Sequence, residues 1–443
     1  MTNSLYKIST YYRPFYSLNK KEGVIYHSLL GNGLVASTKL IRMLNDLRFK
    51  TKIKSKDLNL PVNLLNILKQ RRLIISHNEH ENTSFNKLPE INNNCISHLR
   101  LCLTDNCNMK CSYCHMQCQR GSPNMSIDVA RISLSSYYAL LKRNKIKGKV
   151  TFFGGEPLLN WETLKYSIGW IKKHDTNGEY ISQIYIATNG TLLTSSMAEF
   201  LLKNKVTVSI SLDGLEDKND EMRRMRNDSG SFQFITKGIN ILQEVGHKQF
   251  SLIAVIGNHN IDCIEDIILF AHKKGISLSF HNAFAEPKAI SWSYPDYLMV
   301  ERFFSASNYA KKLGMRVHGP WRWPFAKAFA FNQNPIHCLA SGKEFSITVD
   351  GKIKPCPGFD TDMGSIDNFD QVFSNPLYDK VYKRRAPFLK DCKGCDLEGL
   401  CGGGCMVNAK KNHNGDIFRK DDSCYIVKSL FIKFMNEYVD GLQ

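Results

Sequence analysis

Short apolar runs alternate with segments of helical periodicity through the middle of the chain. The runs are rich in β-branched and aromatic residues and predict six strands: His98–Thr104, Lys149–Phe153, Ile184–Thr188, Val206–Leu212, Phe250–Ile256 and Leu278–Phe280. Apolar residues at helical spacing predict helices near residues 126–143, 160–173, 194–204, 232–245 and 262–274. Strands that alternate with helices predict a parallel sheet with both faces covered, and a doubly wound sheet and a barrel both fit.

Residues 1–75 have a different pattern, which predicts a small α+β module. The expected elements are strands at Phe15–Leu18 and Val24–Leu29, a helix over Leu34–Leu47, a helix that begins at Pro61, and a closing strand at Leu73–Ile75. Strands followed by helices in this order suit a winged-helix-like fold. The polar, Asn-rich residues 77–95 predict a linker.

Three cysteines follow the first predicted strand as C-x3-C-x-Y-C, at Cys107, Cys111 and Cys114, with Tyr113 between the last two. Three thiolates from one loop can hold a four-iron four-sulfur cluster and leave one iron open to another ligand. The alternative is a structural zinc site with His115 as a fourth ligand.

Seven further cysteines lie in the C-terminal part of the chain: Cys338, Cys356, Cys392, Cys395, Cys401, Cys405 and Cys424. The last five include the spacing C-x2-C-x5-C-x3-C, which is far more specific than a lone C-x2-C pair. A zinc ribbon over residues 392–405 is the alternative here.

The cysteine loop, with Gly154-Gly155-Glu156-Pro157 after the second strand, resembles the radical SAM superfamily. The resemblance implies a partial (β/α)6 barrel, with its chemistry at the carboxyl ends of the strands. It implies that S-adenosylmethionine chelates the open iron, and that one electron from the cluster releases a 5′-deoxyadenosyl radical.

The same resemblance implies which residues contact S-adenosylmethionine. The glycines let the backbone come close, and the Glu156 carboxylate accepts from the ammonium group. Arg223 resembles an arginine that pairs with the cofactor carboxylate. The implied cofactor-binding residues are Tyr113, Gly154, Gly155, Glu156, Asn189, Ser209, Ser211, Asp213 and Arg223. No catalytic side chain is assigned from the sequence.

The C-terminal cysteines resemble the SPASM extension of this superfamily, which builds two auxiliary four-iron clusters. The resemblance assigns one complete ligand set to Cys392, Cys395, Cys401 and Cys424. It assigns three ligands of the other cluster to Cys338, Cys356 and Cys405, and leaves its fourth ligand open. Three four-iron clusters and S-adenosylmethionine are therefore the expected cofactors.

The expected organisation has five parts: a winged-helix-like recognition element at 1–76, a linker at 77–96, the radical SAM barrel at 97–284, a bridge at 285–337, and a cysteine-rich SPASM domain at 338–443. The sequence of the bridge predicts one amphipathic helix near residues 296–313. The N-terminal module resembles elements that bind the leader of a ribosomally made peptide by adding it as a strand to a sheet edge.

The net charge is +18, and residues 1–75 hold 14 basic but only three acidic side chains, which indicates an acidic partner for this module. Fourteen cysteines without an export signal indicate a reducing cytoplasm, and no apolar run is long enough to cross a membrane. The expected partners are a precursor peptide, through its leader, and an electron donor such as flavodoxin or ferredoxin.

These features predict a peptide maturase, and a macrocyclic carbon–carbon or ether crosslink is the expected product. Pro357 stands where sulfatase-maturating members have an Asp, which argues against that activity. A thioether-forming maturase and an epimerase are alternatives, the latter with Cys118 or Cys263 as hydrogen donor. A nucleic-acid-binding redox regulator is disfavoured, because a sensor has no use for the S-adenosylmethionine motifs.

Overall fold

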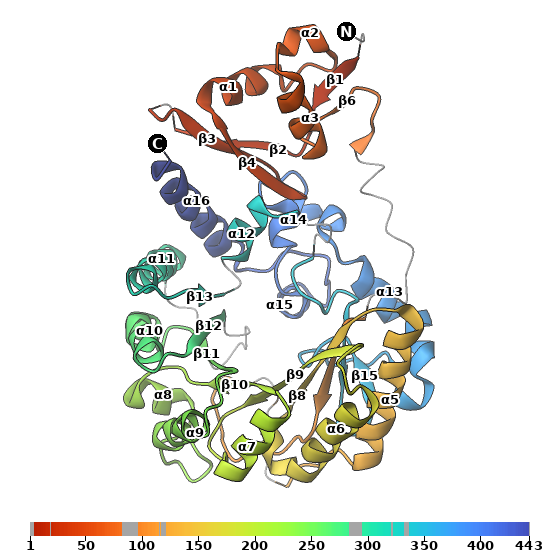
Figure 1. Cartoon of the computed structure of the whole chain (residues 1–443), viewed down its shortest axis with the longest axis vertical. Helices are drawn as coiled ribbons and strands as arrows, with labels where there is room; N and C mark the ends of the chain where they lie inside the picture. Colours follow the sequence, from red (N-terminus) through yellow and green to blue (C-terminus); the bar gives the residue numbers. More distant parts are fainter. Residues whose placement is uncertain are drawn as a thin grey trace. The chain divides into compact units, whose positions relative to one another are not determined.

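The computed structural model describes residues 4–17, 19–81, 96–114, 116, 121–282, 295–319, 322–331 and 336–442. The chain divides into two compact units (Figure 1). The first unit comprises Met1–Glu90, Trp321–Cys338 and Lys383–Gln443, and the second comprises Ile91–Pro320 and Leu339–Tyr382. No helix in the described part of the chain is long and apolar enough to cross a membrane.

The second unit is built on a ten-stranded sheet of order β13-β12-β11-β10-β9-β8-β7-β14-β15-β16. Its strands are β7 (His98–Cys102), β8 (Gly148–Phe153), β9 (Ile181–Thr188), β10 (Thr207–Ser211), β11 (Phe250–Ile256), β12 (Ser277–Asn282), β13 (Val317–His318), β14 (Glu344–Ile347), β15 (Lys352–Lys354) and β16 (Gly364–Ser365). All six predicted strands are confirmed, with bounds that differ by a few residues.

Helices connect and flank these strands. They are α5 (Ile127–Asn144), η2 (Pro157–Asn160), α6 (Trp161–His174), α7 (Ser195–Lys203), α8 (Glu216–Met222), α9 (Phe232–Glu244), η3 (Ile261–Cys263), α10 (Ile264–Lys273), α11 (Asp296–Lys312), η4 (Ile366–Ser374) and α13 (Pro376–Lys383). The five helices predicted between the strands and the helix predicted near residues 296–313 are all present.

Strands β7 to β12 are parallel and lie side by side in sequence order (Figure 1). Because β–α–β crossovers are right-handed, an unbroken order places every connecting helix on the same face of the sheet. A doubly wound sheet would reverse its strand order, so the order favours a partial barrel. The pairing also aligns the carboxyl ends of neighbouring strands, since Cys102 pairs with Phe153 and Thr188 with Ile210.

The N-terminal module of the first unit contains two three-stranded sheets, with orders β5-β1-β6 and β2-β3-β4. Its elements are β1 (Leu5–Ile8), β2 (Tyr12–Phe15), β3 (Glu22–His27), β4 (Gly31–Ser37), α1 (Thr38–Leu47), β5 (Ile53–Lys54), α2 (Ser55–Leu58), α3 (Val62–Gln70) and β6 (Ile74–Ser76). The prediction of a helix from Leu34 was wrong, because residues 31–37 form β4. Ser37 then caps α1 by accepting a hydrogen bond from Leu40 N.

The predicted strand at Phe15–Leu18 was misplaced, because β2 ends at Phe15. The predicted strand at Val24–Leu29 corresponds to β3. The predicted start of a helix at Pro61 is confirmed, because Pro61 is the N-cap of α3.

Strand β3 contributes to two apolar cores of the first unit. Ile25 packs in the core of the N-terminal module, together with Tyr12, Ile41 and Leu44. The neighbouring residues Val24 and Tyr26 pack on the opposite side, in a core of C-terminal residues that includes Leu397, Leu400, Val427, Phe431 and Met435. The module and the C-terminal segment are therefore parts of one folded unit.

The rest of the first unit is short helices around the cysteine-bearing loops, closed by one long helix. These elements are α12 (Trp323–Phe329), η5 (Ala386–Phe388), η6 (Lys390–Cys392), α14 (Glu398–Cys401), α15 (Met406–Asn412) and α16 (Cys424–Asp440). Phe325 and Phe329 of α12 contact Phe434 and Tyr438 of α16, so these aromatic residues pack in the core.

Candidate cofactor site

The Gly154-Gly155-Glu156 turn follows β8 and pairs with the chain just ahead of the cysteine loop. Gly155 N donates to Thr104 O at 2.7 Å, and Glu156 N donates to Asn106 O at 2.9 Å. Gly154 has φ +152°, and a Cβ atom there would lie 2.4 Å from Thr104 O. The turn therefore needs a glycine at this position, because the two backbones touch.

The cysteine loop lies against residues 222–226, which follow α8. Lys110 N donates to Arg224 O at 2.9 Å, and Ser112 N donates to Met222 O at 3.0 Å. Arg226 Nε donates to Cys107 O at 2.5 Å. These contacts fix the backbone of a loop that has no helix or strand of its own.

The three thiols of the loop are partly buried and lie close enough to act on one another electrostatically. Burial is the main cause that raises the pKa of Cys107 to about 12, and it also raises the pKa of Cys111. A cluster would lower these pKa values, because metal binding requires thiolates and releases their protons. One loop that brings together three thiols, with no other type of ligand among them, fits an iron–sulfur cluster.

No group of three or more His, Cys, Asp or Glu side chains in the described ranges is arranged to hold a single metal ion. His115, the zinc ligand of the alternative interpretation, lies outside those ranges.

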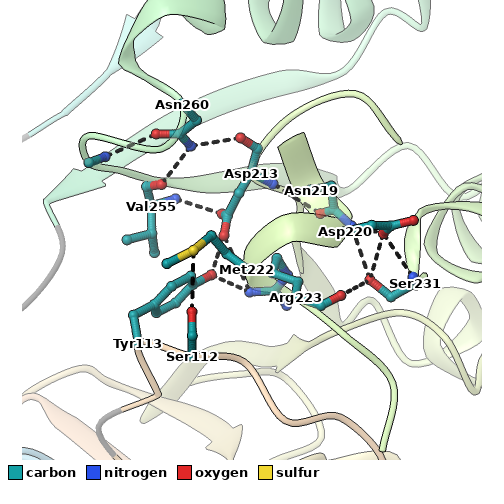
Figure 2. A network of polar contacts seen from close by, with 11 residues as sticks. Ser112, Tyr113, Asp213, Asn219, Asp220, Met222, Arg223, Ser231, Val255 and Asn260 are labelled. Atoms are coloured by element: carbon teal, nitrogen blue, oxygen red, sulfur yellow. Dashed lines mark hydrogen bonds and ion pairs between the residues drawn. The ribbon is translucent and has the colours of Figure 1, made fainter. Parts of the chain in front are cut away.

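Tyr113, Asp213 and Arg223 form a buried polar network (Figure 2). The Tyr113 hydroxyl donates to Asp213 Oδ2 and accepts from Arg223 Nη1 at 2.6 Å. Arg223 Nη1 also lies 3.8 Å from Asp213 Oδ2, and both side chains are almost completely buried. Burial raises the pKa of Tyr113 well above its usual range, so the hydroxyl stays protonated.

Arg223 remains charged in this environment. Burial acts to lower its pKa, but Tyr113, Cys111 and Asp213 outweigh that effect and raise it. Arg223 Nε is buried and has no hydrogen-bond partner within the described part of the chain. A charged donor with a free N–H beside the cysteine loop suits an anionic ligand such as a carboxylate.

Asp213 is itself held by the carboxyl end of the neighbouring strand (Figure 2). Val255 N donates to Asp213 Oδ1 at 2.8 Å, and Asn260 Nδ2 donates to Asp213 O at 2.7 Å. On the other side, Asn219 Oδ1 accepts from Asp213 N at 3.3 Å. These contacts fix the carboxylate that orients Tyr113 and Arg223.

Glu156 and Asn189 are adjacent at the ends of β8 and β9. The Glu156 carboxylate is fully buried and accepts from Thr188 Oγ1 and Asn189 N, both at 2.7 Å, and from Leu158 N at 3.0 Å. A carboxylate has about four acceptor positions, so about one is left for another donor. Asn189 Nδ2 donates to Asn108 Oδ1 at 2.9 Å and lies 3.9 Å from Cys107 Sγ.

Ser209 and Ser211 lie on the partly buried face of β10, whereas Val208 and Ile210 are fully buried on the other face. The alternation is the one that the sequence predicts. The structure therefore brings most of the predicted cofactor residues to one edge of the sheet. Whether each of them contacts S-adenosylmethionine stays a prediction.

The first unit contains a hollow lined by four cysteines: Cys392, Cys395, Cys401 and Cys424. Lys420, Asp421 and Lys428 also line it. Burial is the main cause that raises the pKa of Cys392 to about 12 and of Cys401 to about 11. Four thiols around one hollow fit the complete auxiliary cluster that the sequence predicts.

The other predicted ligand set is divided between the two units. Cys338 and Cys405 belong to the first unit and interact electrostatically. Cys356 belongs to the second unit and follows β15, so a cluster with these three ligands stays a prediction. Cys95 and Cys118 lie outside the described residues.

Several supporting residues were not predicted from the sequence. They are Asn108, Thr188, Asn219, Asn260, Arg384 and Asp421. Thr188 and Asn189 are both part of a strand end that the sequence singled out, and the same reasoning applied to β11 would have found Asn260. The carbonyl partners of Arg384 give no local signal, because they lie 18 to 35 residues further along the chain.

Comparison with known proteins agrees with this geometry. The sequence profile of the Radical SAM superfamily matches residues 101–271. The chain is 25% identical to the radical SAM cyclopropyl synthase TigE of Paramaledivibacter caminithermalis, over 81% of this chain and 77% of that protein. It is 26% identical to the cysteine-type anaerobic sulfatase-maturating enzyme of Clostridium novyi, over 74% of this chain and 92% of that protein. It is 30% identical to the GTP 3′,8-cyclase of Listeria monocytogenes, over 60% of this chain and 80% of that protein.

Solved structures show the same fold. The anSMEcpe protein with bound AdoMet and the Cp18Cys peptide matches with a TM-score of 0.66 at 20% identity, over 78% of this chain and 99% of that chain. Streptococcus suis SuiB bound to the precursor peptide SuiA matches with a TM-score of 0.57 at 19% identity, over 94% of this chain and 99% of that chain. The cysteine loop at the carboxyl edge of a partial barrel, the sequence profile and these relatives together lead to one assignment: the chain belongs to the radical SAM superfamily.

Proposed function

We propose that the protein is a peptide maturase that oxidises a ribosomally made precursor peptide. The observation that carries this proposal is the combination of two sites in one chain. The second unit has the radical SAM loop with its Tyr113–Asp213–Arg223 network, and the first unit has a hollow lined by four thiols. Binding of peptides by the structural relatives anSMEcpe and SuiB supports a peptide substrate.

The chain's own residues bind and orient the cofactor in this proposal. Cys107, Cys111 and Cys114 would hold the radical cluster, which supplies an electron that cleaves S-adenosylmethionine to a 5′-deoxyadenosyl radical. Arg223 would bind the cofactor carboxylate with its Nε–H, which has no hydrogen-bond partner among the described residues. Glu156 would accept from the cofactor ammonium with its remaining acceptor position.

The electron count favours a net two-electron oxidation of the peptide. A peptide carbon would lose one hydrogen atom to the 5′-deoxyadenosyl radical, which gives 5′-deoxyadenosine. Formation of a new bond to that carbon would then release a second hydrogen as a proton, together with one electron. The auxiliary clusters would accept that electron and pass it to a redox protein such as flavodoxin or ferredoxin.

A macrocyclic carbon–carbon or ether crosslink is the product that we propose first. A cyclopropane is a second candidate, because TigE is a radical SAM cyclopropyl synthase and matches 81% of this chain. Closure of a cyclopropane inside one residue and a carbon–carbon crosslink between two residues both remove two hydrogens. Thioether formation has the same electron count, whereas epimerisation leaves the mass unchanged.

The N-terminal module would bind the leader peptide. β4 is the outer strand of the sheet β2-β3-β4, and Arg71 Nη1 already donates to Asn32 O and Gly33 O at 2.9 and 2.6 Å. Residues 34–37 form the rest of that edge and would pair with an added strand. The nearby helix α3 has exposed apolar side chains at Val62 and Ile67, which would pack against a leader.

Mass spectrometry of a modified precursor tests this proposal. Short peptides encoded by neighbouring open reading frames would be tested as precursors, each incubated anaerobically with the reconstituted enzyme, S-adenosylmethionine and a reductant. Loss of two hydrogens is the expected result. Proteolysis between the modified residues then separates the candidates, because a crosslink keeps the fragments joined and a cyclopropane does not. An unchanged mass with a D-residue would show epimerisation instead.

A further inference from the structure

Arg384 is the largest fully buried side chain in the described part of the chain, with 1% of its surface exposed. It follows α13 and belongs to the first unit. Five of its hydrogen bonds go to main-chain carbonyl oxygens. Nε donates to Ile417 at 2.5 Å, Nη1 to Gly402 at 3.5 Å and Gly404 at 3.1 Å, and Nη2 to Gly403 and Arg419, both at 3.2 Å.

Three of these carbonyls belong to the turn Gly402-Gly403-Gly404, which joins Cys401 to Cys405. All three glycines have positive φ, at +70°, +80° and +75°. A Cβ atom would lie 2.4 Å from His337 N at Gly402, and 2.2 Å from the side chain of Asp421 at Gly404. The turn is therefore closely packed, and its carbonyl oxygens converge on one guanidinium. Cys401 and Cys405 belong to different predicted cluster sets.

The guanidinium of Arg384 carries a positive charge in a fully buried position. A buried guanidinium surrounded by neutral carbonyls has a large desolvation cost unless an anion is near. Burial does lower the pKa of Arg384, and the groups that oppose this are, in order, the thiols of Cys338, Cys405 and Cys392, and then Asp421. The leading neighbours are thus cysteines from both predicted clusters, which become anionic when they bind iron.

Asp421 is already engaged in support of the same loop. Its carboxylate accepts from Cys405 N at 2.9 Å, from Ser423 N at 2.9 Å and from Asn408 Nδ2 at 3.3 Å. The carboxylate is buried with 6% of the residue exposed. One carboxylate with three donors neutralises the guanidinium only partly, so the thiolates are the remaining counter-charge.

We propose that Arg384 is the positioning residue of the auxiliary cluster loop and the fixed cation that raises the reduction potential of the cluster beside it. This inference rests on the proposed function, because it requires the auxiliary clusters. Reduction adds one electron to an assembly that is already anionic with thiolate ligands. A fixed positive charge at low dielectric therefore stabilises the reduced form more than the oxidised form.

The test measures clusters without enzymatic turnover. Cys107, Cys111 and Cys114 are replaced by Ala so that only auxiliary iron remains. Arg384→Gln removes the charge, and Arg384→Lys keeps it but cannot reach five carbonyls. Arg419→Gln removes an exposed cation that pairs with Asp391 and is the matched control. Iron and sulfide per chain and the midpoint potential from an anaerobic EPR titration are the measurements.

We expect Arg384→Gln to lose auxiliary iron, or to shift the midpoint potential of the iron that it retains to more negative values. Arg384→Lys should keep a potential near that of the parent protein with lower iron content, and Arg419→Gln should match the parent in both. Full iron content and an unchanged potential in Arg384→Gln would overturn the inference alone. Absence of auxiliary iron in the parent itself would overturn the inference together with the auxiliary-cluster proposal.

Asp421→Asn keeps the electrostatic part testable if neither Arg384 variant folds. Removal of the neighbouring negative charge should shift the midpoint potential to more positive values, opposite to the effect of Arg384→Gln. An unchanged potential in Asp421→Asn would contradict an electrostatic role for this buried pair of charges.

Discussion

Arg223 Nη1 donates a hydrogen bond to the Tyr113 hydroxyl at 2.6 Å, and the two residues are 110 positions apart in the sequence. Tyr113 belongs to the cysteine loop, and Arg223 directly follows α8 at the carboxyl edge of the barrel. Asp213, at the end of β10, contacts both side chains. The network therefore joins the cluster loop to the strand ends where the cofactor would bind.

Replacement of Arg223 by Gln should destabilise the second unit and abolish binding of S-adenosylmethionine. Removal of one partner from a buried ion pair typically costs about 3–5 kcal/mol, because the other charge stays buried. The double variant Arg223→Gln with Asp213→Asn should recover part of the stability but not cofactor binding. Urea unfolding and calorimetric titration measure the two effects. Normal cofactor affinity in the single variant would contradict the role of Arg223.

The exposed neighbour Arg224 offers a control for that experiment. Its side chain is exposed, and its Nε donates to the main-chain oxygen of Asp220 at 3.2 Å. Arg224→Gln removes the same charge from the same segment. It should leave both stability and cofactor affinity close to those of the parent protein.

Arg13 links the N-terminal module to the loop that carries Cys395. Its Nε lies 2.6 Å from Asp396 Oδ1, and its Nη2 donates to Gly394 O at 2.9 Å. Arg13→Gln should therefore lower the iron content of the auxiliary site and leave the radical cluster unchanged. Asp396→Asn is the matched variant and should have a smaller effect, because its exposed carboxylate forms a pair worth about 0–1 kcal/mol. Equal iron content in Arg13→Gln and the parent would refute the link.

His27 should make the first unit sensitive to acid. Burial lowers its pKa from the usual 6.5 to about 3, with Arg72 and Arg13 contributing. The unfolded chain then binds a proton that the folded chain excludes, so stability is lost as pH falls from 6.5 toward 3. At pH 5.5 the expected loss is about 1.4 kcal/mol relative to high pH. The metal-free protein should thus unfold at lower urea concentration at pH 5.5 than at pH 7.5.

The variant His27→Asn isolates this contribution. The ring Nδ1 accepts from Leu29 N and Leu30 N at 3.3 and 3.2 Å, and the Asn side-chain oxygen is a comparable acceptor that does not titrate in this range. The variant should show a smaller difference between the two pH values. An identical pH dependence in parent and variant would assign the acid sensitivity to other groups.

Leader binding should weaken as salt rises, because residues 1–75 hold 14 basic and three acidic side chains. Lys50, Lys52 and Lys54 are exposed, and their joint replacement by Gln should weaken leader binding and reduce its salt dependence. The control replaces the exposed lysines Lys203, Lys237 and Lys248 of the second unit. Fluorescence anisotropy with a labelled leader measures both. Tighter binding to duplex DNA than to the leader would favour a regulator.

Substitution is a better test of this module than its deletion. Val24 and Tyr26 of β3 belong to the core that also contains Val427 and Phe431 of α16. Removal of residues 1–75 would expose that core beside the auxiliary cysteines. A loss of peptide binding in such a truncation would not distinguish recognition from folding.

The strands of the barrel could be predicted because each is a short buried run bounded by turn residues. β8 and β11 are examples, because their β-branched and aromatic residues favour a strand over a helix. β4 could not be predicted from the sequence, because Leu34 and Val35 also fit a helical pattern that continues into α1. Its antiparallel pairing with the preceding strand β3, across the short turn between His27 and Gly31, decided the outcome.

The candidate site likewise has a part that could be predicted from local sequence and a part that could not. Cysteine spacing and the Gly154–Glu156 turn are local signals, so the loop and its neighbours could be predicted. The supporting contacts arise only when distant segments meet, as when Arg384 reaches the carbonyl of Ile417 or Asn260 reaches that of Asp213. The bond formed in the peptide depends on the substrate, about which this chain gives no local signal.

Anaerobic formation of 5′-deoxyadenosine tests the central claim most directly. The reconstituted protein, with S-adenosylmethionine and dithionite, should release 5′-deoxyadenosine that chromatography can quantify. Replacement of Cys107, Cys111 and Cys114 by Ala should abolish this product, because no thiolates remain to hold the radical cluster. Cys263→Ala, which removes a half-buried thiol elsewhere in the same unit, should leave it unchanged. Release of 5′-deoxyadenosine by the triple variant at the rate of the parent would contradict the account.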